Sequence, residues 1–470
     1  MAVLSEAHSD YLASMMNTIA VRKSANKKSE QFYTGEYISN TLNIAVPPEL
    51  SSQLGVASDW PSTVVNSYAE RMRFLGWTGA KAAGVAEISD VAGLPLAVKE
   101  SVLDSLIYGI GFIALEPNDD GIWVAQSVPP TEGTLIWDNV NQRPIAGMRE
   151  RTLVDGHSQK IIYVPEGVIY VSSKNSEIEN FVPHSLGVPS IVRVRNKARS
   201  REWYGRSMIS APVRYYTVAA CRTLEGMELN REFYTYPQRW LKNGTMDMFV
   251  DSDNPTREER IRAGFQAITG SVVALPPPAE PGDPEMELHQ FSSSPPTPFI
   301  EQVRTYSQLM SSATGIPVAY LGFSTENPPS ADAIRAWLDR LILGCRNQQD
   351  LINPDIRRAG WMAACLNGNQ STWQDFTSQV KERWEDPASP TLASDADAIT
   401  KLSQFIDPTS DWALDRLRIP DDQRAKIRQS ASASKLSQLV ESRIAQQKQS
   451  LNDEDTALAD ELASRRGEQS

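Results

Sequence analysis

The sequence predicts an α+β protein, and changes in the spacing of its apolar residues indicate this class. Apolar side chains recur every three to four positions through residues 60–77 and 98–115, as on one face of a helix. Between Trp123 and Val194 they form short runs separated by Pro, Gly, Asn and Asp, a pattern typical of strands. After Gly205 the helical spacing returns. Residues 1–205 are therefore predicted to form an α+β unit, followed by a mainly helical region.

Composition and charge limit the function classes. The chain has 470 residues, 41% of them apolar, which is enough for a large core and argues against wholesale disorder. Its 46 Lys and Arg against 58 Asp and Glu give a net charge of −12, which argues against a protein that holds nucleic acid through a net basic surface. An acidic wall past which nucleic acid moves is still compatible with this charge.

The expected compartment follows from the cysteines and the apolar segments. Three cysteines are too few for a disulfide framework, which favours a reducing assembly compartment. The N-terminus shows no secretory signal pattern. The longest apolar stretch, residues 102–115, contains Asp104 and is shorter than the ~20 residues of a membrane span. We therefore expect a soluble protein with no membrane partner.

The first elements are predicted in chain order. Residues 1–30 are polar, end in a Lys-rich stretch and predict a surface helix. Residues 60–77 carry one apolar stripe and predict a second helix. The helical spacing that begins at Val98 runs into the strand-like GFIAL, so a helix-to-strand turn is expected at Gly109 and Gly111.

Two amphipathic helices flank an inserted module. The first begins at Ser210 and Pro212, keeps one apolar face to about Tyr234 and ends before Pro237. The module then contains a strand-like QRWLKNG, a capping box from Thr256 to Glu259 that opens a short helix, and a strand-like GSVVAL. The second helix begins at Thr297 and ends at Gly315.

A long helix and a looser C-terminal region complete the chain. From Ser330 a near-heptad apolar stripe continues over ~37 residues. Pro354 lies inside this stripe and is expected to kink the helix. The last 80 residues predict two or three further helical segments and a polar tail that is partly disordered without a partner.

Signals for catalysis, metals and cofactors are missing. The sequence contains neither a P-loop pattern nor G-x-S-x-G. Gly109 and Gly111 start a G-x-G-x-x-G pattern, but the third glycine is missing. No histidine has a second ligand at metal-site spacing. We therefore predict no catalytic residue, no metal and no cofactor.

One charge run stands out between the strand region and the first long helix. It contains six basic residues, Arg193, Arg195, Lys197, Arg199, Arg201 and Arg206. Such a run is a candidate contact for phosphates or for an acidic surface of a neighbouring subunit. The alternative is an ordinary solvated face.

Four stretches in a fixed order carry a family resemblance. They are DWPSTVVNSYAERMRFLGW, VLDSLIYGIGFIAL, GRSMISAPVRYYTVAACRTLEGMELNREFYTYPQRW and TGIPVAYLGFSTENPPSADAIRAWLDRL. In this order they resemble the portal proteins of long-tailed double-stranded DNA bacteriophages. The resemblance covers residues 31–370, and its most specific part is the TGIPV, LG and NPxSADAI series.

The resemblance implies a phage portal fold in a ring-shaped homo-oligomer. The implied parts are, in order, a wing at 1–205, a first stem helix at 206–235, a clip at 236–296, a second stem helix at 297–314, a channel loop at 315–330, a long kinked wing helix at 331–368 with its kink at Pro354, and a helical crown with the C-terminal tail at 369–470.

It also implies contact residues and partners. The channel-loop residues expected to face DNA are Tyr320, Phe323, Ser324, Thr325, Glu326 and Asn327, and the expected clip contacts are Trp240, Lys242 and Asn243. The implied role is a ring of about twelve subunits at one capsid vertex, through which the terminase packages DNA and from which DNA is later ejected. Head-to-tail connector proteins, major capsid and scaffolding proteins are the further implied partners, in the virion and, during assembly, the host cytoplasm.

Two other classes stay open at the level of sequence. One is another ring-forming head-to-tail adaptor or minor capsid protein, although adaptors are generally shorter. The other is a cytoplasmic enzyme, which only paired carboxylates such as Asp119 and Asp120 favour, and these are better explained by a hairpin turn before Gly121.

Overall fold

The fold is taken from a computed structural model of the chain. It describes residues 4–37, 58–79, 84–153, 156–172, 177–200, 203–235, 239–243, 250, 256–262, 284–285, 287–290, 295–323, 331–388, 398–403, 405–417, 419 and 423–431. The chain divides into two compact units, Met1–Ala388 and Ser389–Ser470, and each is described by itself.

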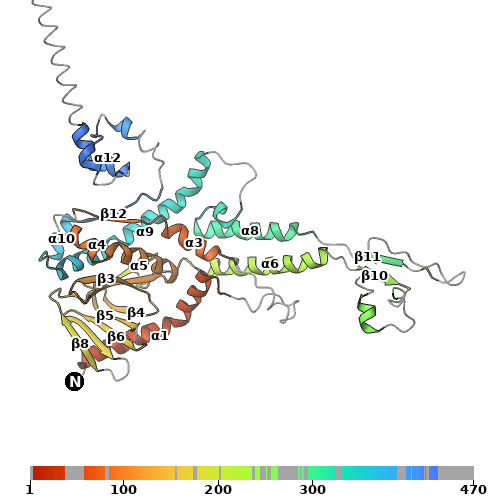
Figure 1. The fold of residues 1–470 in the computed structure, drawn as a ribbon, viewed down its shortest axis with the longest axis horizontal. Coiled ribbons are helices and arrows are strands. Elements are labelled where there is room, and N and C mark those ends of the chain that lie inside the picture. Colours follow the sequence, from red (N-terminus) through yellow and green to blue (C-terminus); the bar gives the residue numbers. More distant parts are fainter. Residues whose placement is uncertain are drawn as a thin grey trace, which may run out of the picture. The chain divides into compact units, whose positions relative to one another are not determined.

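Two antiparallel sheets form the centre of the first unit (Figure 1). The smaller has the order β3-β2-β9, with β2 Ile110–Pro117, β3 Trp123–Val128 and β9 Ile191–Arg195. The larger has the order β4-β5-β6-β7-β8, with β4 Gly133–Asp138, β5 Arg143–Thr152, β6 Ser158–Val164, β7 Gly167–Ser172 and β8 Ile178–Pro183. The predicted strand-rich region is confirmed. The turn between β2 and β3 contains Gly121 at φ 77°, as expected for a hairpin.

Helices cover the sheets. They are α1 Glu6–Thr34, α3 Trp60–Ala69, α4 Ala86–Val91, α5 Leu94–Tyr108, α9 Ala331–Leu366 and α10 Trp373–Gln379. Helices α5 and α9 both pack on the three-stranded sheet. Its central strand β2 is therefore buried on both faces, with the neighbouring residues Ile113 and Ala114, which point to opposite faces, both at 0% exposure.

The predicted helix over residues 60–77 is wrong in its second half. Helix α3 ends at Ala69, and β1 (Phe74–Thr78) follows, paired antiparallel with β12 (Lys381–Trp384). Gly76 has φ 99°, a conformation that a right-handed helix does not contain. The ring of Phe74 meets the rings of Trp77 and Trp384 edge to face. The strand is therefore favoured by a partner about 300 residues away.

This pairing also extends the first unit beyond the predicted start of the crown at residue 369. Helix α10 and β12 belong to the unit that ends at Ala388. In addition to the β1–β12 pairing, Arg357 of α9 donates two hydrogen bonds of 2.7 Å to the buried carboxylate of Glu382. Residues 369–388 therefore belong to the α+β unit.

A buried carboxylate joins the two sheets. Glu116 of β2 is 2% exposed and accepts a hydrogen bond of 2.6 Å from the hydroxyl of Tyr163 on β6. It also pairs with Arg149 at 3.4 Å and Arg151 at 3.0 Å, both on β5. The Arg149 guanidinium further donates to Gln126 of β3 at 2.5 Å. Three donors of the larger sheet thus meet one acceptor of the smaller sheet.

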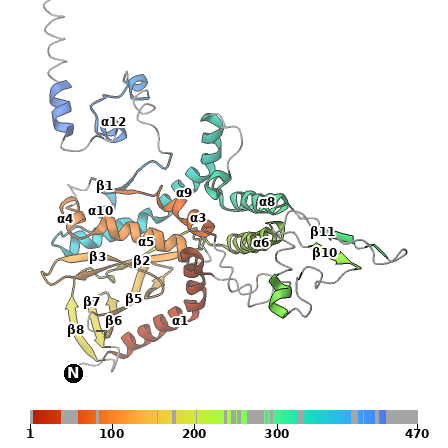
Figure 2. The ribbon, with the colours of Figure 1, turned by 45° about the vertical axis from the view of Figure 1, so that its right-hand side comes forward.

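The two predicted amphipathic helices are confirmed as α6 (Ala211–Thr235) and α8 (Thr297–Thr314). They lie side by side and antiparallel in both views (Figures 1 and 2). Gly226 allows the close approach, because a Cβ there would lie 3.3 Å from the ring of Phe299. Helix α8 ends at Gly315, which has φ 83° as the predicted C-cap requires.

The module between these helices is described in part. The strand-like QRWLKNG forms β10 (Arg239–Lys242), which pairs with β11 (Glu287–Gln290). The capping box is confirmed, since the Thr256 amide donates to Glu259 Oε2 at 2.8 Å and the Glu259 amide donates to Thr256 Oγ1 at 3.3 Å. The predicted strand GSVVAL lies outside the described residues.

Helix α9 carries its predicted stripe into the core. The buried members of the stripe are Leu341, Cys345, Ile352, Ile356, Ala359 and Ala363. Pro354 lies inside the helix, which continues on both sides of it. A short 3₁₀ turn, η2 (Val318–Leu321), lies between α8 and α9.

The second unit is described between residues 398 and 431 with short gaps. Its helix α12 (Asp411–Arg416) buries Ala413 and Leu414, and the guanidinium of Arg428 pairs with the carboxylate of Asp411. The polar tail for which partial disorder is predicted lies outside the described residues.

The Glu116 network predicts a large stability difference between two variants. In Glu116→Ala, the half-buried guanidinium groups of Arg149 and Arg151 lose their counterion. The free energy of unfolding should therefore fall by about 3–5 kcal/mol. Tyr163→Phe removes one hydroxyl donor and keeps both ion pairs, so the loss should be about 1 kcal/mol. Chemical denaturation followed by circular dichroism measures both values. Equal losses would contradict a charge-based junction between the sheets.

Asp104 of α5 predicts a pH-dependent stability. Burial raises the pKa of Asp104 to about 7, against an ordinary 3.8, while its hydrogen bond from Ser127 acts in the opposite direction. The folded state therefore holds this proton more tightly than the unfolded chain, and the stabilisation is lost as pH rises toward 7. Asp104→Asn should exceed the parent in stability at pH 8 by about 2–4 kcal/mol, and the difference should vanish near pH 4.

Denaturation midpoints measured from pH 4 to pH 8 test this expectation. Asp120→Asn is the matched control, because Asp120 is an exposed carboxylate in the β2–β3 turn and should change stability little at any pH. A constant difference between Asp104→Asn and the parent across the pH range would refute the assignment.

Candidate functional site

The start of α6 is fixed by a close crossing of two chain segments. Residues 196–209 pass over the turn that joins α5 to β2. The amide of Asn196 donates to the Gly109 carbonyl at 3.0 Å, and the amide of Met208 donates to the Leu106 carbonyl at 2.8 Å. A Cβ on Gly205 would lie 2.2 Å from the carbonyl oxygens of both Gly109 and Asn196. Helix α6 therefore begins shortly after a position, Gly205, that only glycine fits.

Helix α9 holds the same segment from the other side. The amide of Lys197 donates to Gln348 Oε1 at 3.1 Å, and Gln348 Nε2 donates to the Arg195 carbonyl at 2.7 Å. Lys197 has φ 45°, which a non-glycine residue adopts rarely. The path from β9 to α6 is thus set by hydrogen bonds to α5, β2 and α9.

The predicted basic contact run does not form one surface. Arg193 is 2% exposed, and its guanidinium lies 3.5 Å from the ring centroid of Trp137 on β4. Burial lowers the pKa of Arg193 to about 10, and the neighbouring Asp355 of α9 acts in the opposite direction. The prediction of a contact role is therefore wrong for Arg193, because α9 and β4 cover this side of β9.

The remaining members of the run separate. Arg195 is half-buried, whereas Lys197, Arg199 and Arg206 are exposed. Lys197 and Arg206 line a cavity beside the start of α6. Arg201 lies outside the described residues. A phosphate or subunit contact by the exposed members stays a prediction.

The predicted channel loop is described only at its root. Tyr320 is 39% exposed, and its hydroxyl accepts a hydrogen bond of 2.7 Å from Arg71. Trp60 donates to the Leu321 carbonyl at 3.3 Å, and the Tyr68 hydroxyl donates to the Thr314 carbonyl at 3.1 Å. Helix α3 and the residues just after it therefore anchor this segment.

Of the other predicted loop contacts, the structure describes only one, Phe323. Phe323 is half-buried, while Ser324, Thr325, Glu326 and Asn327 lie outside the described residues. Their contact with DNA stays a prediction. The hydrogen bonds from Trp60, Tyr68 and Arg71 had no signal in the sequence, because they join residues about 250 positions apart.

The predicted clip contacts lie together on the β10–β11 pair. Trp240 is 41% exposed and stacks on the His289 ring at 4.3 Å. Lys242 pairs with Glu287 at 3.2 Å, and His289 lies 2.8 Å from the same carboxylate. Hydrogen bonds from His289 and Lys242 lower the pKa of Glu287. The Asn243 side-chain amide donates to the Glu285 carbonyl at 3.0 Å.

Trp240 and His289 form an exposed aromatic group on the β10–β11 pair. Lys242 and Glu287 already neutralise each other, and such exposed ion pairs contribute little to stability. The Trp240–His289 stack is exposed and presents aromatic surface, a kind of surface enriched in protein–protein interfaces. Contact of these residues with a partner stays a prediction.

Within the described residues, no group of three His, Cys, Asp or Glu side chains could hold a metal ion. No helix in that part of the chain is long and apolar enough to cross a membrane. The three cysteines are unpaired, and burial raises the pKa of Cys221 to about 11 and that of Cys345 to about 12. These thiols are therefore poor nucleophiles at neutral pH.

Sequence similarity identifies the family. The model of the family described as phage portal protein, SPP1 Gp6-like, matches residues 97–414. The portal protein of Mycobacterium phage D29 is 26% identical over 396 residues, which cover 80% of this chain and 78% of that protein. The portal protein of Mycobacterium phage L5 is 27% identical over 391 residues, which cover 79% and 77%.

Solved structures with a similar chain come from gene transfer agent particles. One is from the virion of a native particle, with 14% identity, a TM-score of 0.41 and coverage of 77% of this chain and 90% of that chain. Another is from the neck of a native particle, with 12% identity, a TM-score of 0.38 and coverage of 73% and 89%.

The resemblance drawn from four sequence stretches is confirmed by the family match, which extends over about two thirds of the chain. The helices α6, α8 and α9, most of α5 and the two central sheets lie within the matched residues. This chain belongs to the SPP1 Gp6-like family of phage portal proteins.

Proposed function

We propose that the chain assembles into a ring of about twelve subunits at one capsid vertex and forms the channel for DNA packaging and ejection. The observation that carries this proposal is the antiparallel pair of helices α6 and α8 in a chain of the portal family. In the sequence, these helices flank the module that contains the paired strands β10 and β11. This is the arrangement expected of a stem with a clip. Residues 1–205 and α9 would then form most of the wing.

Exposed apolar residues support self-association. The helices proposed as stem and wing expose large apolar side chains in the isolated chain, namely Tyr215 on α6, Ile300 and Leu309 on α8, and Trp337 and Leu343 on α9. A closed ring uses two different faces of each subunit, so each copy must present apolar area on both sides. We propose that these side chains are buried between neighbouring subunits.

The net charge suits a conduit that releases its DNA. Each phosphate contact that neutralises DNA adds a steep salt-dependent affinity, with a slope of about −0.9 per contact in log salt. Repeated uncompensated contacts around a ring would hold DNA in place and stop translocation. A net charge of −12 per subunit favours weak polar and steric contact instead, and we assign this contact to the channel loop.

Partner proteins would then supply the energy for DNA packaging and complete the assembly of the particle. We propose that the terminase large subunit docks on the clip during packaging and that head-to-tail connector proteins later occupy the same region. Trp240, stacked on His289, is the proposed apolar contact for both. Major capsid and scaffolding proteins would surround the wing, in the host cytoplasm during assembly and at the portal vertex of the virion afterwards. We assign no catalytic activity to this chain.

Native mass tests the ring. Twelve chains of 52.1 kDa should give a particle of roughly 625 kDa with a central hole in negative-stain class averages. Trp337→Glu and Leu343→Glu should shift mass photometry toward small species while circular dichroism stays unchanged, because both side chains are exposed in the isolated chain. Val140→Glu is the matched control, since Val140 is 89% exposed in the β4–β5 turn and belongs to none of the helices proposed as the interface. A full ring in all three variants would refute the assigned interface.

Packaging tests the channel loop. Replacement of residues 324–327 by Gly and Ser should leave the ring mass unchanged and should lower the DNase-protected DNA of assembled particles, because the loop would lose its steric contact with DNA. The same Gly and Ser replacement at residues 139–142 of the β4–β5 turn should package normally. Normal packaging by the loop variant would exclude a role of these residues in DNA movement or retention.

A further inference from the structure

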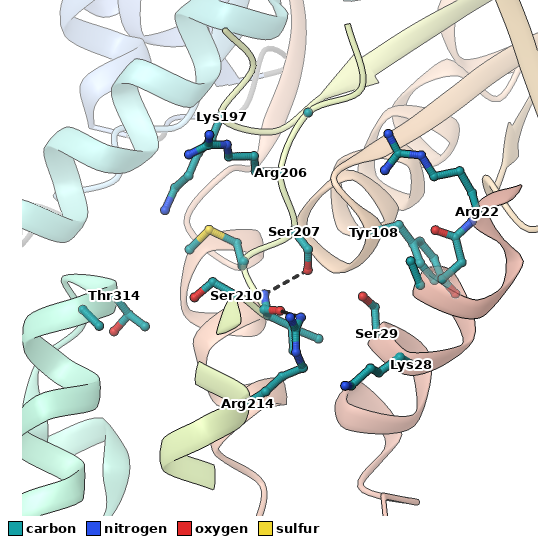
Figure 3. Close-up of a pocket in the computed structure, with 16 residues that line it drawn as sticks. Arg22, Lys28, Ser29, Tyr108, Lys197, Arg206, Ser207, Ser210, Arg214 and Thr314 are labelled. Atoms are coloured by element: carbon teal, nitrogen blue, oxygen red, sulfur yellow. Dashed lines mark hydrogen bonds between the residues drawn. The ribbon is translucent and has the colours of Figure 1, made fainter. Parts of the chain in front are cut away.

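A basic cavity lies where the two stem helices meet the wing. It has a volume of about 540 Å³ and is bounded by α1, the end of α5, residues 197–210, the start of α6 and the end of α8 (Figure 3). Five cationic side chains line it, Arg22, Lys28, Lys197, Arg206 and Arg214. Volumes of 300–1,000 Å³ are typical of small-ligand sites. We refer to this space as the basic cavity.

The lining contains donors without a carboxylate. In addition to the five cations, hydroxyl groups of Ser29, Tyr108, Ser207, Ser210 and Thr314 border the space. Among the described residues, the lining contains no Asp or Glu. Behind the lining, the carboxylate of Glu30 on α1 accepts the hydrogen bond of the Tyr108 hydroxyl. Five positive charges therefore face one space in a chain whose net charge is −12.

Several of these groups are held in place. One Arg214 nitrogen donates to the Ile209 carbonyl at 2.5 Å. The Ser207 hydroxyl donates to the Ile107 carbonyl at 2.5 Å and accepts from the Ile209 amide at 2.9 Å. The Arg22 guanidinium lies 4.3 Å from the ring centroid of Tyr204. The cavity wall is thus preorganised by contacts within the chain, which lowers the cost of binding a ligand.

Helix α6 adds a further positive pole. Ser210 precedes its first residue, and both Ser210 and Arg214 border the cavity. The first amides of a helix have no partner within it and carry part of a positive charge, so they favour an anion. Here this pole coincides with the five cationic side chains, and the two features reinforce each other.

We infer that the basic cavity binds a small, multiply charged oxyanion of the phosphate class. Arginine guanidinium groups bind phosphate oxygens in paired hydrogen bonds, and three of the five cations are arginines. Duplex DNA is a broad rod whose phosphates lie on a convex surface, so it reaches only the rim of a concave space of this size. A free phosphate-bearing ligand fits the interior.

Occupancy would couple the wing to the stem. Arg22 and Lys28 belong to α1, Lys197 and Arg206 to the segment that leaves β9, and Arg214 to α6, while Thr314 ends α8. A bound oxyanion would neutralise mutually repelling charges from α1, from the segment after β9 and from α6, and it would lie beside the end of α8. We therefore expect it to stabilise the angle at which the stem helices leave the wing.

Calorimetry and thermal unfolding of the full chain with pyrophosphate test the inference. Saturable binding with a rise in melting temperature is expected. Lys28→Glu should weaken pyrophosphate binding about tenfold or more, because it replaces a cation of the cavity by an anion. Lys23→Glu is the matched control, since Lys23 is also exposed on α1 but does not line the cavity, and it should bind as the parent does.

Three results would overturn the inference. No saturable pyrophosphate binding would do so, as would equal weakening by Lys28→Glu and Lys23→Glu, which would indicate attraction by overall charge. A short DNA duplex is the second arm. Failure of the duplex to displace pyrophosphate at equal phosphate concentration supports a small ligand. Displacement would reject it and assign the cations to the DNA backbone.

Discussion

The geometry of the first unit depends on the close crossing at Gly109 and Gly205. The chain must come from β9, pass over the α5–β2 turn and enter α6 with no room for a side chain at either position, because a Cβ on Gly109 would lie 2.8 Å from the Gly205 carbonyl and one on Gly205 would lie 2.2 Å from the Gly109 carbonyl. The crossing is closed by hydrogen bonds between main-chain groups. These fix the start of α6, and α8 follows because it packs antiparallel along α6. The same crossing forms one wall of the basic cavity.

Buried charges set the orientation of the layers around this crossing. Glu116 joins the two sheets, Arg357 and Glu382 join α9 to β12, and Arg193 lies between Trp137 and Asp355. Burial of such groups is costly, and they contribute more to a unique arrangement than to net stability. Apolar contacts alone would allow the sheets and α9 to slide, whereas a carboxylate with three fixed donors does not.

The charge distribution separates two kinds of surface. The chain as a whole is acidic, as a channel that passes DNA without binding it requires. Its cations are instead collected in specific places, such as the buried Arg193 and the lining of the basic cavity. The predicted basic run therefore contained residues with different roles: one in the core, one half-buried and two at the cavity. A linear charge pattern does not show this difference, because burial of each cation depends on which distant elements cover it, as Trp137 of β4 and Asp355 of α9 do for Arg193.

The sequence alone determined the elements whose signal is local. A one-sided apolar stripe needs no distant partner to be recognised, so α6, α8 and α9 were predicted to within a few residues, and the Thr256 capping box and the Gly315 cap were correct. Four ordered motifs also indicated the family. Tertiary structure decided what depends on contacts between distant residues. Phe74 and Trp77 form a strand because they pair with β12, about 300 residues away in the sequence. Arg193 is buried because α9 and β4 cover it. Arg22 and Arg214 share a cavity although 192 positions separate them, because the fold brings α1 to the start of α6.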